Sequence, residues 1–299
     1  MNNLKGRVAA TRGGKRSFPG GVVHSRSAIL ALRTEDIANA LIKICLFQTN
    51  KLQIDGYNMK NQRFREIDAL RGTAIVMMVV FHFFFDLNYF GILKNGMYEG
   101  SWLAWQRITI SLFLILVGVS ITLSYGKEGR EKKEFLLKNF KRGLFVFAAG
   151  MLVTAGTYVY PKEGFIIFGI LQFIGIAIII APLFLGFRYL NIIFAAAAIA
   201  AGSLVRSVHS GSLLLLPLGI TPAHFYTLDY VPLFPYFGLV LIGLFLGKTL
   251  YPDGKRGFEM PKNFNFGNGL EFLGRNSLLI YLMHQPILIG LINAYLMLV

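Results

Sequence analysis

Charged residues are scarce in this sequence. Of its 299 residues, 15% are Asp, Glu, Lys or Arg, and 55% are hydrophobic. A soluble domain usually carries about 25% charged residues, and the mean hydropathy of +0.56 adds to the mismatch. The composition excludes an ordinary water-covered domain and predicts a protein that lies in a membrane.

Cysteine is almost absent, because the sequence contains only Cys45. A single cysteine cannot form an intrachain disulfide, and the His, Asp and Glu residues show no spacing typical of metal ligands. We therefore predict neither a disulfide framework nor a metal site.

Acidic residues are half as frequent as basic ones, which gives a formal net charge of +15. Such a charge can indicate nucleic-acid binding. The basic residues, however, gather in 1–65 and in two segments beside apolar runs, 127–142 and 248–275. Basic segments that flank apolar runs are typical of cytoplasmic loops. The charge therefore favours anionic lipid as a partner and argues against nucleic acid.

The sequence contains several long apolar runs. They are continuous, whereas the strands of a membrane β-barrel alternate apolar and polar residues. The runs predict an all-α, polytopic transmembrane bundle of about seven spans. The predicted spans are 73–93, 102–124, 143–160, 164–187, 190–208, 231–250 and 276–298. The third and fourth, joined by a tight turn, are expected to form a hairpin.

The segment 209–230 is apolar but contains Pro217 and Pro222, so a re-entrant or membrane-surface segment fits better than an eighth span. Because the basic segments alternate with nearly uncharged loops, the N-terminus is predicted inside and the C-terminus outside. We expect one transmembrane domain, 59–299, in the plasma membrane. The sequence leaves open whether the protein forms a homo-oligomer.

Residues 1–58 form a basic, Gly-rich extension that lacks the apolar core of a signal peptide. Two explanations stand. Residues 27–48 have the spacing of an amphipathic interfacial helix. Alternatively, 1–58 does not belong to the native protein and translation starts at Met59.

Ionisable residues lie on one stripe of the first span. Arg71 and His82 are eleven residues apart, close to three helical turns, and about 16 Å apart along the axis. Asp68 lies one turn before Arg71, and Asp86 one turn after His82. Because charge inside a bilayer is costly, such residues commonly face a cavity or a partner. His82 and Asp86 are either a hydrogen-bonded tether between helices or an oriented general base.

Three further polar residues interrupt later spans. His284 is either a packing residue or a second histidine in the cavity of His82. Gln172 is either a packing amide or a substrate contact. Arg107 is either an interfacial anchor or the partner of Asp86, and adjacency of the first two spans favours the pairing.

The motif "RFREIDALRGTAIVMMVVFHFFFDLNYFG" (63–91) resembles the start of the heparan-α-glucosaminide N-acetyltransferase catalytic-domain-like family, especially its short prokaryotic members. Three later stretches are also similar to this family or its wider superfamily: "FGILQFIGIA" (168–177), "DYVPLFPYFGLVLIGLFLG" (229–247) and "LGRNSLLIYLMHQPI" (273–287). One departure stands out, since "GMYEGSWLAW" (96–105) has no histidine where the lysosomal member carries its active-site histidine.

The resemblance implies a membrane acyltransferase that moves an acyl group from cytosolic acyl-CoA, with acetyl-CoA expected, to a sugar hydroxyl or amine of a glycan or glycolipid. His82, oriented by Asp86, would be the general base. Arg71, with Asp68 and Gln172, would bind the donor. The acceptor side would include His284 and Arg107. A proton-coupled transporter that uses intramembrane His and Asp is the alternative.

Overall fold

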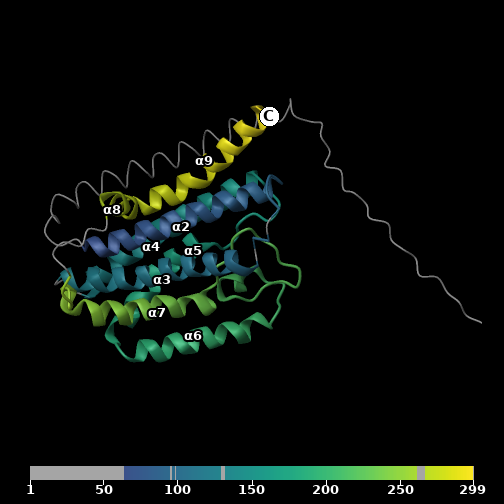
Figure 1. Cartoon of the computed structure of the whole chain (residues 1–299). Coiled ribbons are helices and arrows are strands. Elements are labelled where there is room, and N and C mark those ends of the chain that lie inside the picture. Colours follow the sequence, from purple (N-terminus) through teal and green to yellow (C-terminus); the bar gives the residue numbers. More distant parts are fainter. Residues whose placement is uncertain (1–63, 95, 98, 129–131, 261–266, 299) are drawn as a thin grey trace, which may run out of the picture.

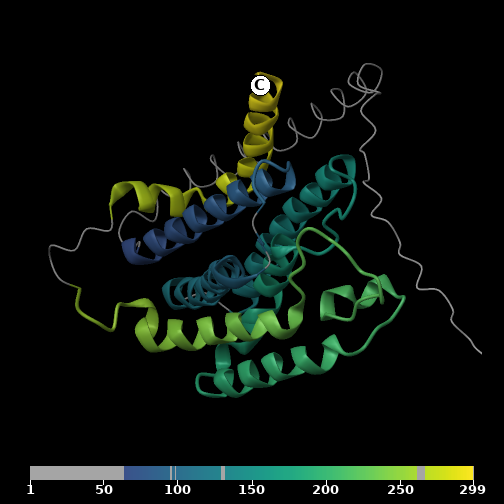
Figure 2. The same ribbon diagram turned by 45° about the vertical axis from the view of Figure 1, so that its right-hand side comes forward.

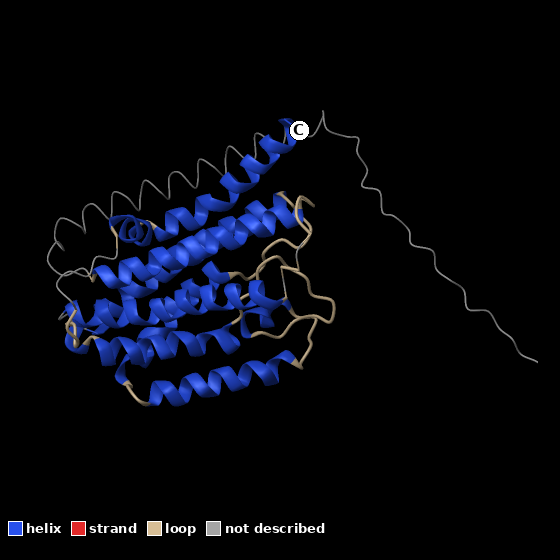
Figure 3. Ribbon diagram, in the orientation of Figure 1, coloured by secondary structure: helices blue, strands red, loops and turns tan. Residues whose placement is uncertain are grey.

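The computed structural model of the chain describes residues 64–94, 96–97, 99–128, 132–260 and 267–298. The two explanations given for residues 1–58 concern a segment that lies outside these ranges. The described chain is helical without a β-strand (Figure 3), which confirms the all-α prediction. Its elements are α2 (Arg65–Tyr89), α3 (Gly100–Glu128), α4 (Lys132–Val159), α5 (Ile170–Ile180), η1 (Ala181–Gly186), α6 (Leu190–Arg206), η2 (Leu213–Leu218), α7 (Leu233–Leu250), η3 (Pro252–Gly254), α8 (Asn268–Arg275) and α9 (Ser277–Leu298).

Five helices of the described chain are long and apolar enough to cross a membrane, namely α2, α3, α4, α7 and α9. Two further apolar segments are shorter, Ile170–Gly186 and Leu190–Arg206. Each predicted span therefore matches a helix, although two of the seven do not reach spanning length. The protein is a helical membrane protein.

Two predicted boundaries were wrong. The span expected over 164–187 starts as a helix only at Ile170, because the preceding backbone pairs with the chain before α7. The Val231 amide donates to the Phe168 carbonyl at 3.2 Å, and the Thr227 hydroxyl donates to the Phe165 carbonyl at 2.8 Å. The basic segment 127–142, expected to be a loop, is largely the beginning of α4.

The helices run side by side in a layered bundle (Figure 1). α3 packs on α7, α7 on α6, and α4 on α5, which agrees with the predicted hairpin of the third and fourth spans. α8 and α9 cover α2, as Figure 2 shows from a second direction. The main core lies between α3, α4, α5 and α7, where Leu114, Phe173 and Leu244 have no exposed surface.

Small residues allow the closest helix contact. A Cβ atom added at Gly118 of α3 would collide with the Val240 carbonyl of α7, and one at Gly243 would collide with the Ile115 carbonyl of α3. Close approach at small residues is a common way for membrane helices to associate. The contact fixes α3 against α7.

The chain between α6 and α7 contains only the short helix η2 and connecting loop. It lies with the 90–94 and 160–169 segments at one end of the bundle (Figure 3). The starts of α2 and α8, with η3, lie at the other end (Figure 1). The predicted alternation of the connections is present, whereas the side of the membrane that each end faces stays a prediction.

Candidate active site

Two histidines meet between α2 and α9. The rings of His82 and His284 have their centroids 5.0 Å apart and are inclined by 57°. His284 is buried and His82 is half-buried. The structure thus brings together the two histidines that the sequence placed 202 positions apart.

His284 is oriented by its own helix. Its Nδ1 lies 2.6 Å from the carbonyl oxygen of Tyr281. A carbonyl oxygen only accepts, so Nδ1 carries the proton in this contact. In the neutral ring, Nε2 then has a free lone pair, and this atom is buried without a hydrogen-bond partner among the described residues.

His82 also has an unsatisfied atom, because its buried Nδ1 has no hydrogen-bond partner in the described chain. Buried polar atoms in proteins are nearly always hydrogen-bonded, and those that are not commonly belong to functional sites. Two such nitrogens on adjacent rings make the pair the candidate site of the chemistry.

Asp86 does not orient His82 as expected. Its Oδ1 accepts a hydrogen bond from Nε2 of Gln285 at 2.8 Å, and no bond joins it to His82 in the described part of the chain. The carboxylate is 3% exposed and its Oδ2 has no partner. The expected tether between helices therefore exists, but it uses the residue next to His284 instead of a histidine.

Arg71 and Asp68 lie at the end of α2 away from the histidines. Arg71 Nη1 is 3.2 Å from Asp68 Oδ1, and its Nη2 donates to the Ser120 hydroxyl of α3. Asp68 also pairs with Arg275 at 3.5 Å. The stripe expected on α2 is present, yet its two halves sit in different surroundings about 16 Å apart along the helix.

Other ion pairs surround Arg71 and Asp68, and together we call this group the charged end. It consists of three buried carboxylates, on Glu66, Asp68 and Glu271, and four arginines, Arg65, Arg71, Arg256 and Arg275. Each carboxylate has at least one arginine partner within 3.5 Å. The charged end links the starts of α2 and α8 to the chain after α7.

Gln172 has its hydrogen bonds satisfied inside the protein. Its Nε2 donates to the Gly150 carbonyl at 3.0 Å and to the Thr154 hydroxyl at 2.8 Å. Its Oε1 accepts from the Gly169 amide at 3.1 Å. This arrangement favours the packing alternative over a substrate contact, because the amide ties the first turn of α5 to α4.

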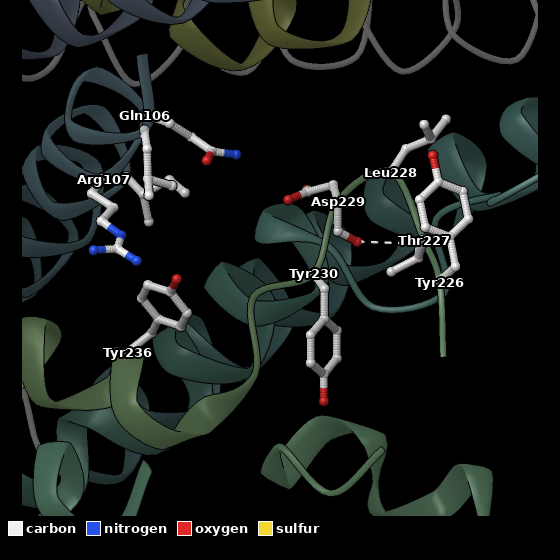
Figure 4. Close-up of a pocket in the computed structure, with 10 residues that line it drawn as sticks. Gln106, Arg107, Tyr226, Thr227, Leu228, Asp229, Tyr230 and Tyr236 are labelled. Carbon is white, nitrogen blue, oxygen red and sulfur yellow. Dashed lines mark hydrogen bonds between the residues drawn. The ribbon is translucent and has the colours of Figure 1, made fainter. Parts of the chain in front are cut away.

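Arg107 does not pair with Asp86, so the expected ion pair was wrong. Asp86 faces α9, whereas Arg107 faces the chain that precedes α7 (Figure 4). Arg107 there borders a pocket of about 370 Å³. Its lining residues come from α3, the 226–230 segment and α7: Leu103, Gln106, Arg107, Ile110, Tyr226, Thr227, Leu228, Asp229, Tyr230 and Tyr236.

Asp229 is the residue of this pocket that sequence reasoning missed. Its Oδ2 accepts from the Ile170 amide at 3.0 Å and so caps the first turn of α5. Burial raises the pKa of this carboxyl to about 6, with the backbone hydrogen bonds opposing the shift. A signal was available, since Asp229 is the only acidic residue between Glu163 and Asp253.

Comparison with known families identifies the family of the chain. The family model described as heparan-alpha-glucosaminide N-acetyltransferase, catalytic, matches residues 63–286. The chain belongs to this family. Comparison with curated proteins gives no match.

As a member of the heparan-alpha-glucosaminide N-acetyltransferase catalytic family, the protein is of a membrane acyltransferase type. His82, His284 and the pocket all lie inside the matched range. The match favours acyl transfer over the alternative of proton-coupled transport. Among the described residues no group of three His, Cys, Asp or Glu could hold a metal ion.

Proposed function

We propose that the protein transfers an acetyl group from cytosolic acetyl-CoA to a sugar hydroxyl or amine of a cell-envelope glycan or glycolipid, across the plasma membrane. The observation that carries the proposal is the His82–His284 pair, with ring centroids 5.0 Å apart and one unsatisfied buried nitrogen on each ring. Histidine is the residue most often used for proton transfer in catalysis.

The protonation of His284 suits it to be the general base. Nε2 holds the free lone pair, because Nδ1–H is directed at the Tyr281 carbonyl. As the acceptor oxygen or nitrogen attacks the thioester carbonyl, Nε2 takes its proton. The carbon–sulfur bond then breaks and the coenzyme leaves as a thiolate.

The second histidine can complete the proton balance. Both rings start neutral: His82 receives through the pair the proton that His284 took from the acceptor and gives a proton to the leaving thiolate, so both rings return to their starting state. The base role expected for His82 is thereby shared between two rings.

The charged end has the chemistry to attract the phosphates of the donor. Four arginines face three carboxylates there, so the cluster keeps a net positive charge. Of the four arginines, Arg71 lies on α2 between Asp68 and His82, and it contacts Ser120 of the adjacent α3. Guanidinium groups bind phosphate through charge-assisted hydrogen bonds. Arg71 would therefore orient the donor, with Asp68 holding its side chain.

Labelled acetyl transfer in membranes tests this function. Membranes that contain the protein are given acetyl-CoA with a labelled acetyl group and an envelope extract, and the label in glycan is counted. We expect a loss of about 100-fold or more for the His82→Ala, His284→Ala double variant. The exposed His224→Ala variant is the control and should keep full activity. Equal labelling by the double variant and the control would refute the proposal.

A further inference from the structure

Two basic residues, which we call the basic pair, lie outside the ion pairs described above. Arg188 lies in the turn between η1 and α6, and Lys248 lies in the last turn of α7. Because α7 continues into η3, Lys248 lies at the same end of the bundle as the charged end. Figure 1 shows α6 at the edge of the bundle with α7 beside it. The basic pair therefore borders the outside of the bundle.

Two separate contacts bring Arg188 and Lys248 to the same place. The Lys248 ammonium donates a hydrogen bond to the carbonyl of Leu185, three residues before Arg188. The Arg188 guanidinium lies 5.2 Å from the ring centroid of Tyr189, and that centroid lies 6.1 Å from the ring centroid of Phe245. Phe245 and Lys248 are three residues apart on α7, so they share a face of the helix. Both contacts thus join the turn of Arg188 to one patch of α7.

The turn that carries Arg188 is held by a buried amide. Asn191 has no exposed surface, and its Nδ2 donates to the Phe187 carbonyl at 2.7 Å and to the Phe184 carbonyl at 3.3 Å. Together with Lys248, Asn191 supplies donors to the carbonyls at the end of η1. An ammonium carries three N–H donors, so Lys248 keeps two that this contact does not use.

No carboxylate is paired with the basic pair in the part of the chain that the structure describes. The buried carboxylates at this end are those of Glu66, Asp68 and Glu271, and each is paired with an arginine of the charged end. Two neighbouring cations without an anion create a positive potential that attracts a negatively charged group. The basic pair therefore has the charge of an anion site.

The surroundings of the basic pair select a lipid over a soluble anion. The chain on both sides of Arg188 exposes large apolar side chains, on Leu183, Phe187, Tyr189, Leu190 and Ile193. α6 continues from there for 17 residues, about 26 Å, which is longer than one leaflet of a bilayer core about 30 Å thick. Tyrosine is typical of the membrane interface. A phospholipid would place its phosphate at the cations and its acyl chains along α6.

We propose that Arg188 and Lys248 bind the phosphate of one anionic phospholipid from the leaflet at the charged end, with Tyr189 beside the headgroup. Basic pockets between membrane helices are suited to anionic headgroups. The bound lipid neutralises the two cations and covers the junction of η1, α6 and α7. Since this site uses neither the histidine pair nor the charged end, its test is independent of acetyl transfer.

Lipid retention by the full chain tests the site. The protein is reconstituted into nanodiscs that contain equal amounts of phosphatidylglycerol and phosphatidylcholine. It is then extracted into detergent, and the lipids that stay bound are counted by native mass spectrometry. We expect one phosphatidylglycerol per chain, retained at least about tenfold in preference to phosphatidylcholine. Glycerol 3-phosphate, added in excess as a soluble phosphate, should not displace it.

Variants with a matched control assign the retention to the basic pair. Arg188→Gln and Lys248→Gln each remove one charge, and each should lower the preference for phosphatidylglycerol about fivefold. Arg188→Glu should abolish the preference, because a carboxylate repels the phosphate. Lys133→Gln removes an exposed charge from the first turn of α4 and should keep the preference of the wild type.

The Arg188 variants keep the test decisive if Lys248→Gln destabilises the end of η1. Arg188 makes no hydrogen bond to another described residue, and thermal unfolding in phosphatidylcholine alone should give these variants the Tm of the wild type. Equal retention of both lipids by the wild type, or displacement by glycerol 3-phosphate, would overturn the proposal. A preference that survives Arg188→Glu, or that falls equally in Lys133→Gln, would mean a general attraction to the net charge and would also overturn it.

Discussion

The charged end and the histidine pair both include ionisable residues of α2, but these residues differ in whether their hydrogen bonds are satisfied. At the charged end, Glu66 accepts from Arg256 at 2.7 Å and 2.9 Å and from the Tyr251 hydroxyl at 3.1 Å. At the histidine pair, His82 and His284 each keep a buried nitrogen without a hydrogen-bond partner in the described chain. α2 carries both Glu66 and His82.

This difference indicates which residues contribute to stability and which are available for chemistry. A paired carboxylate has no capacity left for a substrate, and its removal leaves partly exposed arginines without their partner. An unsatisfied imidazole nitrogen costs stability in the folded protein, but it is free to take or give a proton. We therefore expect substitutions of Glu66 and Glu271 to change folding and substitutions of the two histidines to change turnover.

The largest effect should come from the histidines. His82→Ala and His284→Ala should each reduce kcat by about 10²–10⁴-fold, because each removes one partner of a single proton relay. The double variant should lose little more than the worse single variant, since residues that act as a unit are not additive. Kinetics on the three purified variants measure this. If the fold-loss in kcat of the double variant equals the product of the two single losses, the two rings act independently.

Breaking the charged end should affect folding instead. Glu66→Ala removes the acceptor shared by Arg256 and Tyr251, and the free energy of unfolding should fall by about 2 kcal/mol. The activity per folded molecule should stay near that of the wild type. Denaturation in mixed micelles gives the stability, with the exposed Glu134→Ala of α4 as control. An activity loss larger than the folding loss would place Glu66 in the reaction.

The Asp86–Gln285 pair is intermediate between the fully paired charged end and the unsatisfied histidine pair. It has one good hydrogen bond, 2.8 Å long, and one unsatisfied oxygen at Oδ2. Gln285→Ala should lower the free energy of unfolding by about 1.5 kcal/mol, because a buried carboxylate loses its donor. Asp86→Leu combined with Gln285→Leu should recover most of that stability. If the double variant does not regain this stability, Asp86 has further stabilising partners in the folded protein.

The smallest effect concerns pH and Asp229. Burial raises the pKa of this carboxyl from 3.8 to about 6, so its contribution to stability is present below pH 4 and is lost as the pH rises through 6. Arg107 and Tyr236 line the pocket with it. Asp229→Asn removes the cost of the buried charge.

Thermal unfolding measures the effect of that change. The Tm of Asp229→Asn relative to the wild type should be higher at pH 8 than at pH 4, by a few degrees. Glu163→Gln should show no such trend. A difference that does not change with pH would mean that the carboxyl at 229 is already neutral or already compensated over the whole range.

Periodicity and apolar run length were enough to predict the helices and the stripe on α2. Local sequence could not predict which partner each polar residue would choose. Asp86 bonds to Gln285, which is 199 residues away, and Arg107 faces Asp229 instead of the adjacent α2. Those choices depend on how α9 and the chain before α7 pack, which a single-helix pattern does not contain. The start of α5 was missed for the same reason, because the Phe168 carbonyl pairs with a distant segment.

The shortness of α5 has a consequence for the backbone that precedes it. Its eleven residues cover only about 17 Å, roughly half the thickness of a bilayer core. Irregular backbone at that depth is tolerated only where protein shields it or water wets it. The segment before Ile170 meets this condition through protein contacts, because its backbone bonds to the chain that precedes α7.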